Sequence, residues 1–310
     1  MSDPAATPVA AAAEAVQVRR RLPLWRLLVR DRFALVAAFW LALLVVCMAF
    51  GPELLGKAAT ALDLRARNTP PGSLEKGWLA VLGTDALGRS MLARLVVATR
   101  NTMAVALTAI TLALLVGGLL GMIAGYVGGW SSHLIMRGAD VLQSFPSLLL
   151  AVVVLYVLEP RVSNLVVVLA VTRLPVYVRV ARAEVLEIRE RLFVQAARAL
   201  GGGRRHILRR HIAPVVAPTL LTILTVDFAV VMLAESSLSF LGIGIQPPEI
   251  TWGLMVAQGR NHLAVAWWLS FLPGLAIMLA AMSANVLSSW LRTVGDPSQR
   301  WRLEAPRGER

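Results

Sequence analysis

Three charged side chains interrupt stretches of the sequence that are otherwise apolar. Asp227 lies near the middle of an apolar run at 212–233, Arg173 interrupts the run at 164–180, and Glu235 follows the first of these runs. An ionised group among hydrocarbon is costly unless it has a partner or faces a polar cavity. These residues therefore predict either a polar path for a solute or hydrogen bonds between helices. For Arg173, a side chain that reaches toward the membrane interface is an equal alternative.

Other reactive residue types do not gather into a site. The single cysteine, Cys47, lies in an apolar run, and the four histidines are scattered: His133, His206, His211 and His262. No phosphate-binding loop is present, because Gly201-Gly202-Gly203 lacks the lysine and the preceding strand that such a loop needs. We therefore expect no catalytic residue, no metal site and no cofactor or nucleotide site in this chain.

The composition is that of an integral membrane protein. Of 310 residues, 57% are apolar and only 16% are charged, and the mean hydropathy is +0.67. The net charge of +13 could suggest a nucleic-acid partner. The basic residues, however, concentrate between the apolar runs, which fits membrane orientation better. We expect contact with lipid and none with nucleic acid.

Six apolar runs predict an all-α protein with about six transmembrane helices. They lie at 33–50, 102–127, about 145–158, 164–180, 212–233 and 267–290. Arginines before the first run predict a retained span with a cytoplasmic N-terminus, and six spans then place the C-terminus there too. We divide the chain into a disordered cytoplasmic tail (1–18), a first span with an external loop (19–101), a core domain (102–292) and a cytoplasmic tail (293–310).

The loop charges support this topology except in one place. Arginines are dense at 179–210 and near the C-terminus, whereas the loop between spans five and six has only Arg260. The first external loop departs from the trend with several basic residues, among them Arg67, Arg89 and Arg94. Within that loop, Thr84 or Asp85 could cap an amphipathic helix at the outer interface.

Small residues in the second span predict close helix packing. Gly117 and Gly121 have the G-x-x-x-G spacing, and Gly118, Ala124 and Gly125 are near. Such residues let two helices approach where lipid gives them no hydrophobic reason to associate. A specific dimer motif is the sharper interpretation, and packing inside the protein is the more frequent one.

The segment 189–214 is a charged, sharply turned island between two spans. Apolar residues at helical spacing continue from Val185 to Leu200 and predict an amphipathic helix. Gly201 and the two glycines after it end that helix. A second, basic helix should follow. By these residues alone, a solvated helix between two membrane spans is also possible.

The same segment resembles the cytoplasmic "EAA" loop of permease subunits of bacterial ABC importers. The resemblance rests on Gln195, Ala196, Ala197, Gly201 and Pro214 at the family's spacing. It implies that these residues form a coupling helix, which fits into a cleft of an ATPase subunit. Gln195 stands where glutamate is usual, and Ala213 stands where leucine is usual. The first departure removes a charge that could contribute to docking.

Further strings resemble the importer branch that handles dipeptides, oligopeptides and nickel. They are Leu82-Gly83-Thr84-Asp85-Ala86-Leu87-Gly88-Arg89, Ser144-Phe145-Pro146-Ser147, the string Glu235-Ser236-Ser237-Leu238-Ser239-Phe240-Leu241-Gly242, and Phe271-Leu272-Pro273-Gly274. The resemblance implies a type I ABC importer permease in the inner membrane. It also implies a second related permease, one or two cytoplasmic ATPase subunits that bind ATP, and an extracytoplasmic binding protein. Short peptides are the favoured solute.

Two other classes of function remain open at this point. In an ion-coupled secondary transporter, Asp227 would carry a proton or an ion, and transport would need no ATPase. A membrane enzyme would need a cluster of nucleophile, base or metal ligands, which the interfacial loops lack. We rank the enzyme last.

Overall fold

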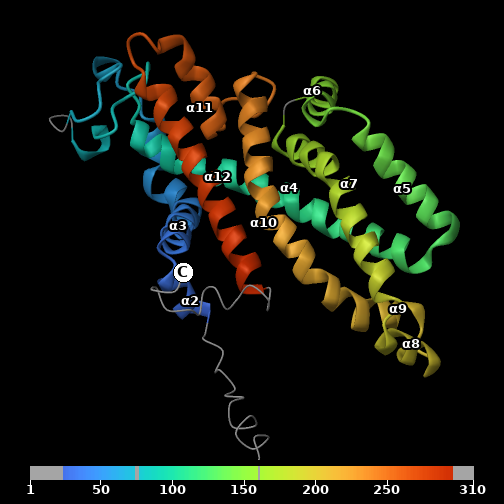
Figure 1. The fold of residues 1–310 in the computed structure, drawn as a ribbon. Coiled ribbons are helices and arrows are strands. Elements are labelled where there is room, and N and C mark those ends of the chain that lie inside the picture. Colours follow the sequence, from blue (N-terminus) through green and yellow to red (C-terminus); the bar gives the residue numbers. More distant parts are fainter. Residues whose placement is uncertain (1–23, 74–76, 160, 296–310) are drawn as a thin grey trace, which may run out of the picture.

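The computed structural model describes residues 24–73, 77–159 and 161–295 and shows a helical protein (Figure 1). Its helices are α2 (Leu24–Arg30), α3 (Arg32–Thr60), α4 (Met91–Val127), α5 (Gly129–Gln143), α6 (Ser147–Leu158), α7 (Val162–Ile188), α8 (Leu192–Ala199), α9 (Arg204–Ile207), α10 (Ala213–Phe240), α11 (Trp252–Gly259) and α12 (Trp268–Gly295). Short 3-10 turns lie at Leu64–Ala66, Trp78–Ala80 and Arg260–His262, and a π-helical turn lies at Leu208–Ile212. The predicted tail at 1–18, and 296–310 of the other tail, lie outside the described residues.

Five helical segments are long and apolar enough to cross a membrane, and a bent pair can supply a sixth crossing. The five are α3, α4, α7, the continuous helix 204–240 that includes α10, and α12. The bent pair is α5 and α6, whose axes differ by 88°. The prediction of an all-α protein with about six spans is confirmed.

The third span differs from the run predicted at 145–158. That run covers only α6, and a crossing made by the bent pair would begin with α5 at Gly129. The two helices are separated at Pro146, which precedes α6. Proline lacks a backbone donor and disfavours helical geometry in the residue before it, here Phe145. The chain therefore turns at this point instead of continuing straight.

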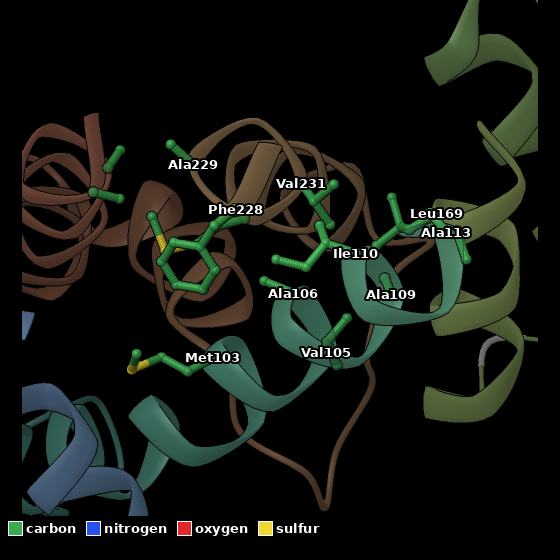
Figure 2. Packing of buried hydrophobic residues seen from close by; sticks show 14 of the residues in the cluster. Met103, Val105, Ala106, Ala109, Ile110, Ala113, Leu169, Phe228, Ala229 and Val231 are labelled. Atoms are coloured by element: carbon green, nitrogen blue, oxygen red, sulfur yellow. The ribbon is translucent and has the colours of Figure 1, made fainter. Parts of the chain in front are cut away.

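Helix α4 is the centre of the packing. It contacts α3, α7 and α10, and its most extensive contact is with α7. Figure 2 shows Ala106, Ile110 and neighbouring α4 side chains facing Phe228 and Val231 of α10, with Leu169 of α7 close by. All of these side chains are buried.

The small residues of α4 produce the close contact with α7. A Cβ atom added to Gly117 or Gly125 would lie 2.9 Å from a carbonyl oxygen of α7, and one added to Gly121 would lie closer still. The three carbonyls repeat at the same four-residue spacing: Leu174, Val178 and Arg182. Packing inside the protein, rather than a dimer contact, therefore explains this motif.

The predicted interfacial helix in the first external loop is wrong. Helix α4 begins at Met91 and continues to Val127, and the described residues between α3 and α4 form only 3-10 turns. Its cap is Ser90, whose Oγ accepts a hydrogen bond from the backbone nitrogen of Ala93 at 3.2 Å. Thr84 and Asp85 lie in a folded loop before this cap, where both are buried.

We predict that Gly121→Ala destabilises the protein by about 1–3 kcal/mol, because the new methyl group must displace the α7 backbone. Gly138→Ala in α5 is the matched control, since nothing lies within 4 Å of an added Cβ there. The unfolding temperatures of both variants are measured in detergent, with size-exclusion chromatography to detect the loss of folded protein on heating. Equal unfolding temperatures for the two variants would contradict the packing role of Gly121.

Candidate functional site

The segment between α7 and α10, which was predicted to be cytoplasmic, forms the tip of a helical hairpin (Figure 1). Helix α8 ends in a turn at Gly201, whose φ is 82°. Gly202 then donates its backbone N–H to the carbonyl of Ala197 at 3.0 Å. A Cβ on Gly202 would lie 2.6 Å from that carbonyl oxygen, so a side chain there would disrupt the turn. The glycines end the helix as predicted, and the basic α9 follows.

The predicted amphipathic helix is divided into two parts. Val185 and Ile188 belong to the end of α7 and are buried, and the chain breaks its helix before α8 begins at Leu192. Within α8, Val194 is the buried residue. The prediction of a single apolar stripe from Val185 to Leu200 is therefore wrong, because the break at the end of α7 turns α8 so that it presents a different face.

The break leaves apolar side chains of α8 and its end largely exposed. Leu192 is 83% exposed and Leu200 is 89% exposed, while Phe193 is 42% exposed. Exposed leucines beside exposed Ala196 form an apolar surface at the tip of the hairpin. Apolar patches of this kind mark interaction sites.

The residues that resemble the coupling loop lie together at this tip, except Pro214. Gln195 is exposed and donates its Nε2 hydrogen to the carbonyl oxygen of Glu190 at 3.0 Å, which satisfies a backbone acceptor at the break. Ala197 is half-buried and packs on the core. Pro214 lies in the first turn of α10, where a missing backbone donor is harmless.

Arg173 and Asp227 form an ion pair between α7 and α10. The guanidinium Nη2 of Arg173 donates to Oδ1 of Asp227. The Asp227 side chain is 4% exposed and that of Arg173 is 23% exposed. Tyr177, one turn after Arg173, is fully buried and within electrostatic reach of Asp227. Both charges were identified from the sequence, but their pairing was not. The signal for it was the presence of two opposite charges in two different apolar spans.

Glu235 has a different environment, because it has no exposed surface. Its Oε1 accepts a hydrogen bond from Ser239 Oγ at 2.8 Å, and Oε2 accepts one from Ser236 at 3.3 Å. The Ser239 hydroxyl in turn accepts from the backbone nitrogen of Ile245 at 3.3 Å. This arrangement fixes the loop after α10, which favours a structural role for Glu235 over contact with a solute.

A second charged cluster, which sequence reasoning did not identify as a site, surrounds Asp85 outside the core. One carboxylate oxygen accepts from the backbone nitrogens of Leu87 and Arg89 at 2.9 Å each. The other accepts from Arg89 Nε at 2.7 Å and from buried Arg94, which also donates to Gln258 at 2.9 Å. This cluster lines a cavity of about 320 Å³ and ties the first external loop to α4 and α11.

The surroundings of Asp85 shift its pKa downward. Burial alone would raise the pKa of the carboxyl group, but the charge of Arg94 and the hydrogen bonds from Arg89 outweigh burial. A carboxyl group with a lowered folded-state pKa stabilises the fold above its unfolded pKa of about 4. That stabilisation is lost as the pH falls through the lower folded pKa.

We predict that acid releases the loop at 61–90. Pepsin cleavage of this loop should increase as the pH falls below about 4, and Asp85→Asn should be cleaved readily above that pH as well. Asp31→Asn, which removes a carboxylate charge at the other end of α3 but keeps the oxygen that caps the helix, is the control. A pH profile of cleavage that is identical in Asp85→Asn and the unaltered chain would show that this carboxylate does not hold the loop.

We also predict that Asp227→Leu destabilises the protein by about 3–5 kcal/mol, because it leaves the Arg173 guanidinium without its partner. The double variant Arg173→Met/Asp227→Leu should recover most of that loss, since two apolar side chains can pack without charge. Unfolding temperatures in detergent test both. A double variant as unstable as the single one would show that the pairing contributes nothing.

Comparisons with known proteins agree on one family. Residues 117–301 match the model described as binding-protein-dependent transport system inner membrane component. The chain is 35% identical, over 84% of its length and 86% of the relative, to a probable D,D-dipeptide transport system permease protein of Escherichia coli (strain K12). It is 35% identical, over 88% of its length and 90% of the relative, to a di/tripeptide transport system permease protein of Pseudomonas aeruginosa (strain UCBPP-PA14).

A third relative and a solved structure are consistent with these matches. A glutathione transport system permease protein of Pectobacterium atrosepticum is 33% identical over 88% of this chain and 89% of the relative. The fold matches a chain of the MetNI methionine ABC transporter in inward-facing conformations, with a TM-score of 0.51 and 16% identity over 65% of this chain and 97% of that chain. The protein therefore belongs to the binding-protein-dependent transport system inner membrane components and is a multi-pass inner-membrane permease subunit of an ABC importer.

Proposed function

We propose that this permease forms part of a path for short peptides and that α8 couples it to a cytoplasmic ATPase. The exposed apolar surface of α8, at the tip of the hairpin between two spans, carries the proposal. Relatives named for D,D-dipeptide, di/tripeptide and glutathione transport support a peptide-like solute. In this arrangement both termini are cytoplasmic, and the chain has no catalytic activity of its own.

The partners follow from the importer family. A second, related permease completes the path, one or two ATPase subunits bind ATP, and an extracytoplasmic binding protein delivers the solute. Gln195, Ala196, Ala197 and Gly201 form the coupling element, and Pro214 begins the span that follows it. The small side chains of the two alanines permit close approach to a groove on the ATPase.

Closure of the ATPase would act on the hairpin as a unit. Helix α8 connects to α7 on one side and to α10 through α9 on the other. The ion pair between Arg173 and Asp227 joins these two arms inside the membrane. A displacement of α8 is therefore passed to both arms together. ATP binding shifts the population between inward-open and outward-open arrangements by its different contacts in each.

Arg173 and Asp227 are also our candidates for residues that line the path, with Arg173 as the more accessible of the two. Their pairing argues against the ion-coupled transporter, in which Asp227 would bind and release a proton or cation. One Asp227 oxygen already accepts from the Arg173 guanidinium, which leaves less of the carboxylate free to bind a cation.

We predict that Leu200→Asp abolishes ATP-dependent peptide uptake in proteoliposomes containing the assembled transporter. An exposed leucine can be replaced without harm to the fold, but a charge there opposes burial against the ATPase. Leu62→Asp is the matched control, because Leu62 is 67% exposed in the first external loop.

The fraction of ATPase subunit that copurifies should fall with Leu200→Asp and remain unchanged with Leu62→Asp. Uptake that persists without any ATPase subunit would refute the proposal, and Asp227→Asn would then be the variant to examine for ion coupling.

A further inference from the structure

An unpaired basic patch lies where the hairpin tip meets the start of α10. We define it as Arg204, Arg205, His206, Arg209 and Arg210, which together with Gly203 line an open groove of about 830 Å³. All five side chains are exposed. No ion pair joins any of the four arginines to a carboxylate of the described residues. Between Glu190 and Asp227 the sequence contains no acidic residue.

The position of the patch along the helix places it near lipid headgroups. The continuous helix 204–240 has 37 residues, about 55 Å at 1.5 Å per residue. A bilayer is about 40–45 Å thick with its headgroups, and its hydrocarbon core is about 30 Å. The apolar run that begins at Ile212 is long enough to cross that core. Arg209 and Arg210, within a turn of this run, therefore lie at the level of the headgroups.

We propose that this basic patch binds the phosphate groups of anionic phospholipids at the cytoplasmic surface. Guanidinium groups match the geometry of phosphate, since their planar fork donates two hydrogen bonds at once. Several arginines at one membrane surface also attract anionic lipid by charge. The patch is distinct from the apolar surface of α8. It is connected to that helix through His211, whose ring centroid lies 5.7 Å from that of His206 in the patch and 6.5 Å from that of Phe193 in α8.

Bound lipid would have a mechanical consequence for the transporter. The basic patch is continuous with α10, and α8 lies directly before it in the chain. A headgroup held at the patch fixes the base of α10 at the membrane surface. Helix α8 is then positioned relative to the bilayer. Lipid binding itself depends neither on the identity of the solute nor on the ATPase.

The test compares how much phosphatidylglycerol the unaltered transporter and its variants retain after purification in nanodiscs that contain phosphatidylglycerol and phosphatidylcholine. Native mass spectrometry counts the retained lipid. Arg209→Gln/Arg210→Gln should weaken phosphatidylglycerol binding on the order of tenfold or more, because each basic residue near the surface contributes about a fivefold gain in affinity. Lys57→Gln/Arg65→Gln, which removes two exposed charges from the external side, is the matched control and should leave binding unchanged.

Further measurements distinguish a lipid headgroup from a soluble anion. Arg209→Lys/Arg210→Lys should keep part of the binding, because charge remains but the fork is lost. Added salt should weaken binding, and inorganic phosphate at equal ionic strength should not displace the lipid. Displacement by inorganic phosphate alone would overturn the proposal in favour of a soluble anion.

The ATPase is the main competing partner for the basic patch. If Arg209→Gln/Arg210→Gln retains phosphatidylglycerol but loses the copurifying ATPase subunit, the patch is a protein contact and the lipid proposal is wrong. The lipid proposal is also refuted if Arg209→Gln/Arg210→Gln binds phosphatidylglycerol as well as Lys57→Gln/Arg65→Gln does. Neither result bears on Leu200→Asp, so failure here is distinguishable from failure of the proposed function.

Discussion

The close approach of α4 and α7 is the contact on which the rest of the structure depends. Gly117, Gly121 and Gly125 bring the α4 backbone against the carbonyl oxygens of α7, where any side chain would collide. Lipid offers no hydrophobic driving force between helices, so dense packing of this kind has to supply the association. With α7 fixed against α4, its cytoplasmic end and the helix that follows acquire a defined position. The hairpin with α10 is built from that position.

Charges in this protein serve three different purposes, which their surroundings explain. The pair of Arg173 and Asp227 has a buried carboxylate and a partly buried guanidinium, and its role is to join α7 and α10, since buried pairs add little net stability. The arginines of the basic patch form no ion pair with a carboxylate of the described residues and can bind phosphate. Charges of the first kind restrict motion between helices, and those of the second kind face another molecule.

The external arginines belong to a third class and explain the exception to the charge pattern of the loops. Arg89 and Arg94 surround Asp85, and Arg67 donates to the carbonyl of Ala86 at 2.8 Å. Side chains held in this way fold the loop onto the membrane domain. They are structural groups rather than free charges of a connecting loop. The excess of basic residues in this loop, which was predicted to be external, is therefore compatible with six spans.

The sequence by itself determined the features that depend on local pattern. Apolar runs of about 20 residues favour helices in lipid, because a helix of that length crosses the bilayer and satisfies each backbone donor and acceptor within its own segment. Gly201 had to end a helix, and G-x-x-x-G had to mark close packing, because both follow from the absence of a side chain. The spacing of Gln195, Ala196 and Ala197 before that glycine carried the resemblance to importer permeases.

The tertiary structure decided what depends on contacts between distant residues. The helical spacing of the apolar residues from Val185 to Leu200 could not reveal that they belong to two helices. The break between α7 and α8 changes the direction of the chain but leaves the spacing of these residues in the sequence unchanged. Nor could spacing show that Arg173 meets Asp227, 54 residues later, since that contact exists only when α7 and α10 lie side by side. Asp227 and Glu235 were both predicted to line a solute path. Both are buried, and they differ in their partners: an arginine of another helix for Asp227 and serines of its own helix for Glu235. Local pattern fixes the geometry of one helix, whereas the partner of a buried charge is set by which helices pack together.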